Sequence, residues 1–441
     1  MPEFKRPKTE KEYQENFKQI KPLMNNTEAH VESGRCLFCY DAPCIKACPT
    51  GIDIPLFIRQ IHSGNIKGSA RTIYSANYFG KACGQVCPTE VLCEGSCVFT
   101  EQNIKPIEIG RLQAFATDNA IKENSKLFIP QKDTNKKVAI IGAGPAGISA
   151  ACELRLAGFG VDIFEANDKP SGLTLYGVAP YKIDNETVLS EMDYLQKTFG
   201  YNVQYNSHIN PQALKNLEKD YDAILLAIGL GTTGELNISG EDLENYFGAI
   251  NFIKDIRIKK QKTLVGQNVL VLGGGNTAMD AASEAARMGA ETVALCYRRS
   301  KGEMPAYDFE YDLAKSVSVF GIFNIAPMEI LGDKKVEGVK FIRTNVVNGK
   351  VEPIKDSEHI LPCDMVIRAT GQSKFVDFLD SIENINLDKS GKIVVNEQTC
   401  QTDNPKYFAA GDALNGGKEV VNAAAEGKLA AKGIIEFLEA R

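Results

Sequence analysis

Two closely spaced groups of cysteines near the start of the chain are the residues whose type and spacing most directly indicate chemistry. The sequence has 12 cysteines, and eight of them lie between Cys36 and Cys97. The first group has the spacing Cys-x2-Cys-x4-Cys-x3-Cys-Pro, and the second has Cys-x3-Cys-Pro-x5-Cys-x3-Cys. The members are Cys36, Cys39, Cys44 and Cys48, followed by Cys83, Cys87, Cys93 and Cys97.

This pattern favours iron–sulfur clusters. A cubic cluster needs four ligands, so the chain must return to it from several directions, and a cysteine followed by proline can bind a second cluster. Cys44 and Cys48 are four residues apart, about one helical turn, which suits ligands of two adjacent clusters. Zinc is the alternative, but zinc sites typically pair two Cys-x2-Cys units, and this sequence has one such unit.

Composition agrees with metal rather than disulfides. The 441 residues are enough for two or three domains, and the net charge of −6 gives no basic surface for nucleic acid or an anionic membrane. No apolar run reaches the length of a membrane span, and the first residues do not form a signal peptide. We therefore expect a soluble cytoplasmic protein, where dense cysteines indicate metal binding.

A glycine-rich turn in the second quarter of the chain predicts a dinucleotide site. The turn begins at Gly142, follows an apolar run and precedes an alanine-rich segment. In this pattern Gly142 makes the tight turn, Gly144 lets the backbone approach a pyrophosphate, and Gly147 lets the helix pack on the strand. The next apolar run ends in an acid that can accept hydrogen bonds from a ribose. The residues assigned to this site are Gly142, Gly144, Pro145, Ala146, Gly147 and Glu165.

A second turn of this kind has alanine in place of the third glycine. The strand expected after it ends in two arginines rather than in an acid. Arginine suits a 2′-phosphate, which favours NADPH over NADH; the alternative is that both arginines border a solvated loop. The residues assigned here are Gly273, Gly275, Asn276, Thr277, Ala278, Arg298 and Arg299.

Further elements resemble those of flavoproteins that bind two dinucleotides. The Gly-Asp pair near the C-terminal end resembles the element whose acid binds the ribityl chain of FAD, and two Ala-x-Gly turns resemble the points where the chain leaves and re-enters the FAD domain. An earlier Gly-Leu pair resembles a flavin-contacting loop, although Val-Ala-Pro follows where Ile-Pro is usual. The first turn is then the FAD site. These resemblances assign Gly172, Leu173, Gly229, Gly371, Gly411 and Asp412.

The predicted fold class is α/β, with an all-helical N-terminal Fe–S domain followed by two Rossmann-like domains, the FAD domain being interrupted by the NAD(P) domain. The expected boundaries are 1–125 for the helical domain with two [4Fe-4S] clusters, 126–245 for the first part of the FAD domain, 246–367 for the NAD(P)H domain and 368–441 for the second FAD part.

The cysteine strings beginning at Cys36 and Cys83 closely resemble the N-terminal domain of dihydropyrimidine dehydrogenase, and less closely the small subunit of bacterial glutamate synthase. The resemblance covers essentially the whole chain. It implies that seven cysteines and one glutamine bind two clusters, with Gln113 as that glutamine, where glutamate synthase subunits usually carry Glu. The alternative eighth ligand is Cys83. The implied sets are Cys36, Cys39, Cys44 and Cys97 for the first cluster, and Cys48, Cys87, Cys93 and Gln113 for the second.

The combination of cofactors predicts a relay. Flavin takes two electrons together as hydride from NAD(P)H, whereas iron–sulfur clusters carry electrons singly, and no protein residue is assigned a catalytic role. A (β/α)8 barrel for FMN and pyrimidine needs about 250 further residues. The resemblance therefore implies an electron-input subunit that donates to a separate FMN/Fe–S subunit, which reduces uracil and thymine. The alternatives are a glutamate synthase small subunit and a non-catalytic redox-sensing or assembly module.

Overall fold

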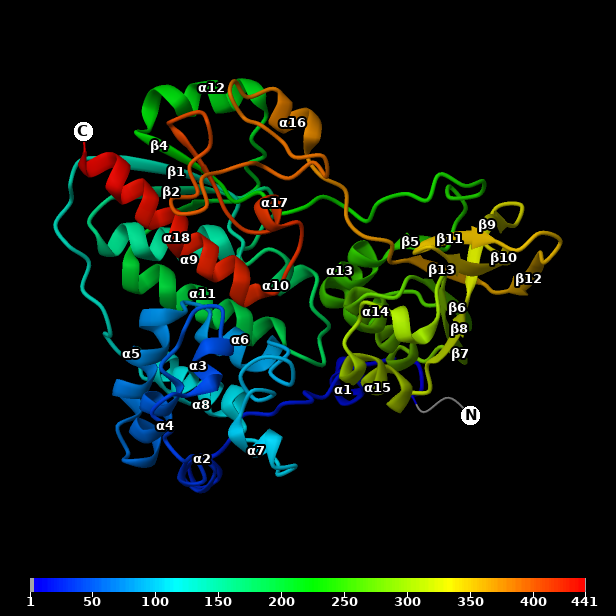
Figure 1. Ribbon diagram of the computed structural model, residues 1–441, viewed down its shortest axis with the longest axis horizontal. Coiled ribbons are helices and arrows are strands. Elements are labelled where there is room, and N and C mark those ends of the chain that lie inside the picture. Colours follow the sequence, from blue (N-terminus) through cyan, green and yellow to red (C-terminus); the bar gives the residue numbers. More distant parts are fainter. Residues whose placement is uncertain (1–3, 441) are drawn as a thin grey trace. The chain divides into compact units, whose positions relative to one another are not determined.

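The computed structural model describes residues 4–440, and the chain forms two compact units (Figure 1). The main unit contains residues 20–175, 182–230 and 374–440. The insert unit contains residues 4–19, 176–181 and 231–373. The predicted fold class is confirmed: a helical N-terminal part precedes two parallel sheets of Rossmann type.

Short helices make up the cysteine-rich part of the main unit. Asp53 and Asn65 cap two of them, because each side chain accepts an amide of the first turn. The apolar faces of these helices bury Phe57, Ile58 and Ile73 in a core that also contains Cys97. The helices are α2 (Asn26–Gly34), α3 (Pro43–Ala47), α4 (Ile54–His62), α5 (Ile66–Ala76), α6 (Gly80–Val86), α7 (Val98–Glu101) and α8 (Ile109–Lys122).

The rest of the main unit is built on a parallel five-stranded sheet in the order β14-β4-β1-β2-β3. The edge strand β14 comes from the C-terminal part of the chain, so the sheet is completed only by residues that follow the insert in the sequence. The strands are β1 (Lys137–Ile141), β2 (Gly160–Phe164), β3 (Asn202–Gln204), β4 (Ala223–Leu226) and β14 (Tyr407–Ala409). The helices are α9 (Pro145–Leu156), α10 (Leu173–Tyr176), α11 (Asn185–Phe199), α12 (Pro211–Asp220), α16 (Val376–Asp380), α17 (Asp412–Asn415) and α18 (Val420–Glu439).

Helices α9 and α18 lie side by side although they are far apart in sequence (Figure 1). The contact is close because Gly427 has no side chain: a Cβ there would lie 2.1 Å from the Ala146 carbonyl oxygen. A Cβ at Gly411 would likewise lie 3.0 Å from the Ala146 Cβ. The C-terminal helix therefore packs against the helix that begins at the first glycine-rich turn.

The insert unit has a second parallel sheet in the order β5-β13-β6-β7-β8, and a smaller antiparallel sheet in which β10 pairs with β9, β11 and β12. The strands are β5 (Tyr246–Gly248), β6 (Asn268–Leu272), β7 (Thr292–Tyr297), β8 (Phe320–Phe323), β9 (Ile325–Leu331), β10 (Gly338–Val347), β11 (Lys350–Pro353), β12 (His359–Pro362) and β13 (Met365–Arg368). The helices are α1 (Glu10–Asn16), α13 (Ala249–Lys259), η1 (Lys260–Lys262), α14 (Asn276–Arg287), η2 (Lys301–Glu303) and α15 (Asp308–Ser316).

The N-terminal arm, residues 4–19, belongs to the insert unit, whereas the sequence-based boundaries placed it with the cluster domain. The Tyr13 hydroxyl donates to the Ile256 carbonyl at 3.2 Å, and Asn16 Nδ2 donates to the Arg287 carbonyl at 2.7 Å. Buried Tyr13 therefore adds to the apolar core of this unit. A polar arm carries too weak a periodic signal for sequence reasoning to locate its partner.

The Glu241 carboxylate organises the segment that enters the insert unit. It pairs with Arg368 at 2.6 Å, and the side chains are only 14% and 11% exposed. It also accepts the Ile238 amide at 2.9 Å and the Tyr246 hydroxyl at 2.8 Å. Burial alone would raise the pKa of this carboxyl, but the hydrogen bonds, that of the Ile238 amide first, lower the pKa to about 2.

We expect Glu241→Gln to lower the free energy of unfolding by about 1–3 kcal/mol at neutral pH, because a charge-assisted partner of Arg368 is lost. The pKa of Glu241 in the folded protein lies below the usual value of 4.5. The stabilisation that Glu241 gives is therefore present above pH 4.5 and is lost as the pH falls through about 2. Thermal unfolding of both proteins between pH 7 and pH 2.5 measures this. A difference that grows as the pH falls would contradict the assignment.

Candidate cluster and dinucleotide sites

Four of the predicted ligands surround one cavity of the main unit. Cys36, Cys39, Cys44 and Cys97 line it, and almost all the other lining residues are apolar. Burial raises the pKa of Cys36 and raises that of Cys44 to about 12. The thiolate forms of Cys36 and Cys44 would therefore be stabilised by a positive charge in this cavity, which iron would supply. The apolar members of the lining are Leu37, Ala42, Pro43, Ile54, Pro55, Ile58, Val98, Phe99, Ile107 and Ile109.

A second cavity holds the remaining candidates. Its lining includes Cys48, Cys83, Cys87, Cys93 and Gln113, which is one more than the four ligands of a cluster. The Cys83 thiol is hydrogen-bonded to Cys87, and this contact together with burial raises the pKa of Cys87 well above its usual range. The structure thus brings Gln113 and Cys83 to the same cavity.

The orientation of Gln113 bears on that choice. This side chain is buried, and its Nε2 donates to the Gly80 carbonyl at 2.7 Å. A carbonyl oxygen cannot donate, so the amide nitrogen must face Gly80 and Oε1 is the atom left to bind a metal. The hydrogen bond to Gly80 of α6 therefore leaves Oε1, and not Nε2, available to a ligand.

Among residues 4–440, no three Cys, His, Asp or Glu side chains converge closely enough to hold a single metal ion. The eight cysteines are divided equally between the two cavities.

The first glycine-rich turn joins β1 to α9 and forms a backbone cradle. Gly142 has φ +106°, and a Cβ there would lie 2.4 Å from the Ala227 carbonyl oxygen. A Cβ at Gly147 would lie 2.0 Å from the Gly142 carbonyl oxygen. Gly144, in contrast, faces open space. The first and third glycines are thus required by packing, and the second leaves room for a pyrophosphate at the start of α9.

Glu165 follows β2 and is buried beside this turn. Its Oε2 accepts a hydrogen bond from the Ala143 amide at 2.8 Å. Its Oε1 accepts hydrogen bonds from the backbone amide and from Nδ2 of Asn167, each at 2.8 Å. The acid predicted to bind a ribose therefore also holds the glycine-rich turn in place. Each carboxylate oxygen can accept two hydrogen bonds and Oε2 accepts one here, so these contacts leave capacity for a ribose hydroxyl.

Two residues beside the predicted Gly172–Leu173 loop were missed by sequence reasoning. The hydroxyls of Ser171 and Thr174 are buried, and neither has a hydrogen-bond partner among the described residues. The Ser171 amide donates to the Ala143 carbonyl at 2.7 Å, which places this loop against the glycine-rich turn. Unpaired buried hydroxyls at this position fit the polar groups of a dinucleotide. A single serine or threonine has no sequence pattern that predicts a role in binding.

The C-terminal Gly-Asp element lies at the start of α17. Gly411 has φ +77°, and its amide donates to Glu426 Oε2 at 2.9 Å. Asp412 Oδ1 accepts the Lys418 amide at 3.3 Å, and burial raises the pKa of Asp412. Val421, in the first turn of α18, lines the second cluster cavity. The flavin half and the second cavity are therefore adjacent.

The second glycine-rich turn joins β6 to α14 in the insert unit. A Cβ at Gly273, where φ is +153°, would lie 2.4 Å from the Ala369 carbonyl oxygen, whereas Gly275 faces open space. Asn276 Oδ1 accepts the Tyr307 amide at 3.0 Å. Buried Ala278 fills the position of the third glycine. Thr277 is the next residue of this turn after Asn276, in the first turn of α14.

The two arginines after β7 differ. Arg299 donates to the Gly349 carbonyl at 3.2 Å and lies 3.7 Å from Glu303. Arg298 is exposed, and its side chain has no hydrogen bond or ion pair with any residue between 4 and 440. Arg298 is thus the more available of the two for a 2′-phosphate. The predicted turns at Gly229 and Gly371 both have positive φ and face open space.

Comparisons with known proteins agree with this arrangement. The family profile described as dihydropyrimidine dehydrogenase domain II, 4Fe-4S cluster, matches residues 13–125, and that described as pyridine nucleotide-disulphide oxidoreductase matches residues 136–427. The chain is 33% identical to the NAD-dependent dihydropyrimidine dehydrogenase subunit PreT of Escherichia coli (strain K12), over 97% of this chain and 98% of that protein. It is 32% identical to the glutamate synthase (NADPH) small chain of the same organism, over 96% and 94%.

Solved structures share the dinucleotide-binding fold. FprA of Mycobacterium tuberculosis in complex with NADPH has a TM-score of 0.57 at 20% identity, over 69% of this chain and 85% of that chain. Thioredoxin reductase of T. acidophilum has a TM-score of 0.53 at 21% identity, over 69% and 99%. Both similarities concern the fold alone.

The fold and these sites define an NAD(P)H-dependent flavoprotein oxidoreductase that also carries iron–sulfur clusters. The chain belongs to the pyridine nucleotide-disulphide oxidoreductase family, with an N-terminal 4Fe-4S domain of the dihydropyrimidine dehydrogenase type. The predicted resemblance to dihydropyrimidine dehydrogenase and glutamate synthase subunits is confirmed, as are the predicted cofactors FAD, [4Fe-4S] and a nicotinamide dinucleotide. The protein is an NAD(P)H-dependent FAD and iron–sulfur oxidoreductase.

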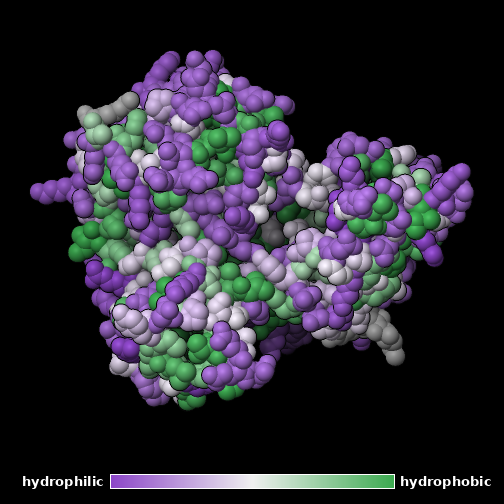
Figure 2. Space-filling view, in the orientation of Figure 1, coloured by the Kyte–Doolittle hydropathy of each residue, from purple (hydrophilic) through white to green (hydrophobic). Residues whose placement is uncertain are grey.

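None of the helices within residues 4–440 combines the length and the apolar character of a membrane span. Hydrophilic residues are widely spread over the visible face (Figure 2).

Replacing the two competing ligand candidates tests the second site. We expect Cys83→Ser to keep both cluster signals in electron paramagnetic resonance (EPR) and about eight irons per chain. Gln113→Ala should remove or change one signal, because the side-chain oxygen proposed to bind the second cluster is lost. Cys152→Ser, a buried thiol outside the cluster domain, is the matched control. Loss of one EPR signal in Cys83→Ser but not in Gln113→Ala would contradict the assignment of Gln113 as a ligand.

Proposed function

We propose that this chain is the NAD(P)H-oxidising subunit of a dihydropyrimidine dehydrogenase and passes electrons to a separate FMN-containing subunit that reduces uracil and thymine. The observation that carries the proposal is Gln113. Its side chain lies in the second cavity with Cys48, Cys87 and Cys93, and its amide nitrogen is engaged by Gly80. The 33% identity to a dihydropyrimidine dehydrogenase subunit over nearly the full length of both chains supports the same activity.

When bound, FAD takes hydride from the nicotinamide, and the clusters carry single electrons. The residues of this chain order the sites. Val421 joins the second cavity to the flavin half, and Cys48 lines the same cavity. Cys44, one helical turn earlier in α3, lines the first cavity. These contacts support a route from the flavin half through the second cavity to the first, and we infer that the first cavity donates to the partner.

A glutamate synthase small subunit is the second candidate, because that relative is 32% identical over most of both chains. The two functions differ in the protein that accepts the electrons, and they share the oxidation of NAD(P)H by this chain. Purified protein with its cofactors should oxidise NAD(P)H with ferricyanide and should not reduce uracil alone. Absence of ferricyanide reduction in fully flavinated protein would instead indicate the redox-sensing module.

We expect uracil-dependent NAD(P)H oxidation only after co-expression with an FMN/Fe–S partner of the dihydropyrimidine dehydrogenase type, since residues 4–440 form the cluster, FAD and nicotinamide parts and a (β/α)8 barrel for FMN and pyrimidine needs about 250 further residues. Oxidation of NAD(P)H is followed by its absorbance, with glutamine plus 2-oxoglutarate as the comparison substrate. The matched control is the same partner without this chain. Activity of this chain alone with uracil would refute the division of labour.

Arg298 should decide the preference for NADPH. We expect Arg298→Ala to raise the KM for NADPH by about 10-fold or more and to leave the KM for NADH unchanged, because only NADPH carries the 2′-phosphate. Arg299→Ala is the matched control with a smaller expected effect, since Arg299 is engaged by Gly349 and Glu303. Equal effects of Arg298→Ala on both nucleotides would refute the role.

A further inference from the structure

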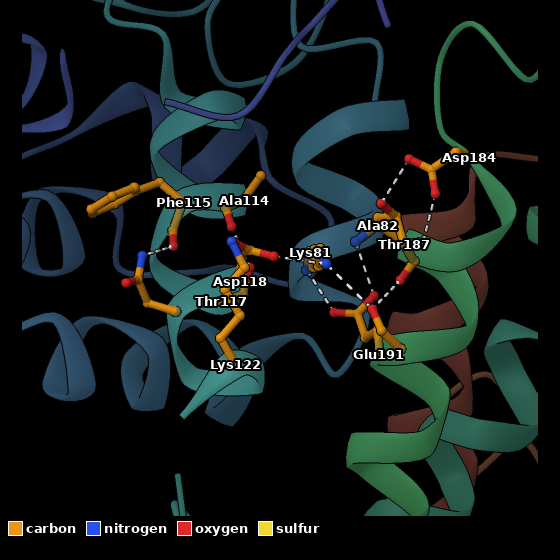
Figure 3. A network of polar contacts seen from close by, with 12 residues as sticks. Lys81, Ala82, Ala114, Phe115, Thr117, Asp118, Lys122, Asp184, Thr187 and Glu191 are labelled. Atoms are coloured by element: carbon orange, nitrogen blue, oxygen red, sulfur yellow. Dashed lines mark hydrogen bonds and ion pairs between the residues drawn. The ribbon is translucent and has the colours of Figure 1, made fainter. Parts of the chain in front are cut away.

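A carboxylate from the flavin half of the main unit contacts the first turn of α6 (Figure 3). Glu191 belongs to α11 and is fully buried. Its Oε1 accepts the Lys81 amide at 2.6 Å, and its Oε2 accepts the Ala82 amide at 2.9 Å. Amides of a first helical turn have no partner within their own helix, and the preceding residue of α6 offers no side-chain cap. Glu191 therefore caps α6 from a distant part of the chain.

The same turn is also held by α8. Lys81 Nζ pairs with Asp118 at 2.9 Å, and both side chains are buried. Asp118 also pairs with Lys122 at 2.8 Å (Figure 3). Gln113, five residues before Asp118 in α8, donates to the Gly80 carbonyl. Helix α6 thus lies between one carboxylate of the flavin half and two polar side chains of the cluster domain.

Burying this carboxylate is unfavourable unless its oxygens are satisfied. Burial raises the pKa of Glu191 to about 7, against the opposing effect of the Ala82 and Lys81 amides. The Tyr74 hydroxyl donates a third hydrogen bond at 3.0 Å. Three donors from the cluster domain therefore surround an acid that belongs to the flavin half, two of them in the first turn of α6 and one on α5.

We propose that Glu191 is a positioning residue for the second cluster, acting through α6. The helix begins at the amides that Glu191 accepts and ends at Cys87, whose amide donates to the Cys83 carbonyl at 3.0 Å. A shift of its first turn would move Cys87 and also the Gly80 carbonyl that orients Gln113. The proposal rests on the proposed ligand set of the second cluster and does not depend on the pyrimidine substrate.

The test uses the full-length protein with flavin and clusters at pH 8, where the Glu191 carboxyl is ionised. In Glu191→Gln the amide nitrogen meets one of the two backbone donors, so α6 loses a cap contact. We expect an altered EPR signal and reduction potential for one cluster only. Cluster reduction after mixing with NAD(P)H should slow by about 10- to 100-fold, as for other residues that orient metal ligands, while flavin reduction stays unchanged.

Hydrogen exchange gives a readout that does not require turnover. The peptide containing Lys81 and Ala82 should lose amide protection in Glu191→Gln. Glu153→Gln is the matched control, because Glu153 of α9 accepts the Tyr78 hydroxyl at 2.7 Å and does not contact α6 amides. This variant should keep both EPR signals and native exchange at α6.

Each outcome decides the proposal. Selective change at one cluster with native flavin content supports it, and native EPR and cluster reduction in Glu191→Gln overturn it. If Glu191→Gln cannot be isolated, Glu191→Asp keeps the charge and shortens the side chain, so native behaviour of that variant overturns the proposal. Loss of flavin and both clusters together in every variant would show a general folding role and also overturn it. Failure of uracil reduction with a partner would instead count against the proposed function alone.

Discussion

The cost of burying thiolates is the constraint on which the cluster domain depends. Eight cysteines line two cavities whose other walls are largely apolar, and burial raises the thiol pKa values described above. Burial favours the protonated form of Cys36, Cys44 and Cys87, and iron bound among the cysteines would favour their thiolates. The short helices around them share one small apolar core. The clusters therefore act as part of the core of this domain.

Buried carboxylates connect the elements that the chain brings together from distant positions. Glu165 holds the glycine-rich turn, Glu241 holds the entry to the insert, and Glu191 caps α6. In each case the oxygens accept backbone amides, which satisfies the charge at low cost. Such carboxylates fix the geometry of loops and short helices that apolar packing alone specifies weakly.

The order of the sites follows from two short elements. Helix α3 places Cys44 at the first cavity and Cys48 at the second, while the first turn of α18 brings Val421 to the second cavity. Both dinucleotide turns place a glycine without neighbours at the start of a helix, where a pyrophosphate is favoured. The chain thus aligns a flavin half and two cluster cavities within one unit.

Local patterns were sufficient to predict the fold class, the cofactors and the two glycine-rich turns. Spacing such as that from Cys44 to Cys48, or from Gly142 to Gly147, is a property of a few consecutive residues, and short-range sterics translate it directly into structure. The orientation of Gln113 by Gly80 and the cap that Glu191 gives to α6 were decided only by the tertiary structure. Both join residues more than 30 positions apart, and contacts of that range leave no periodic trace in a single sequence.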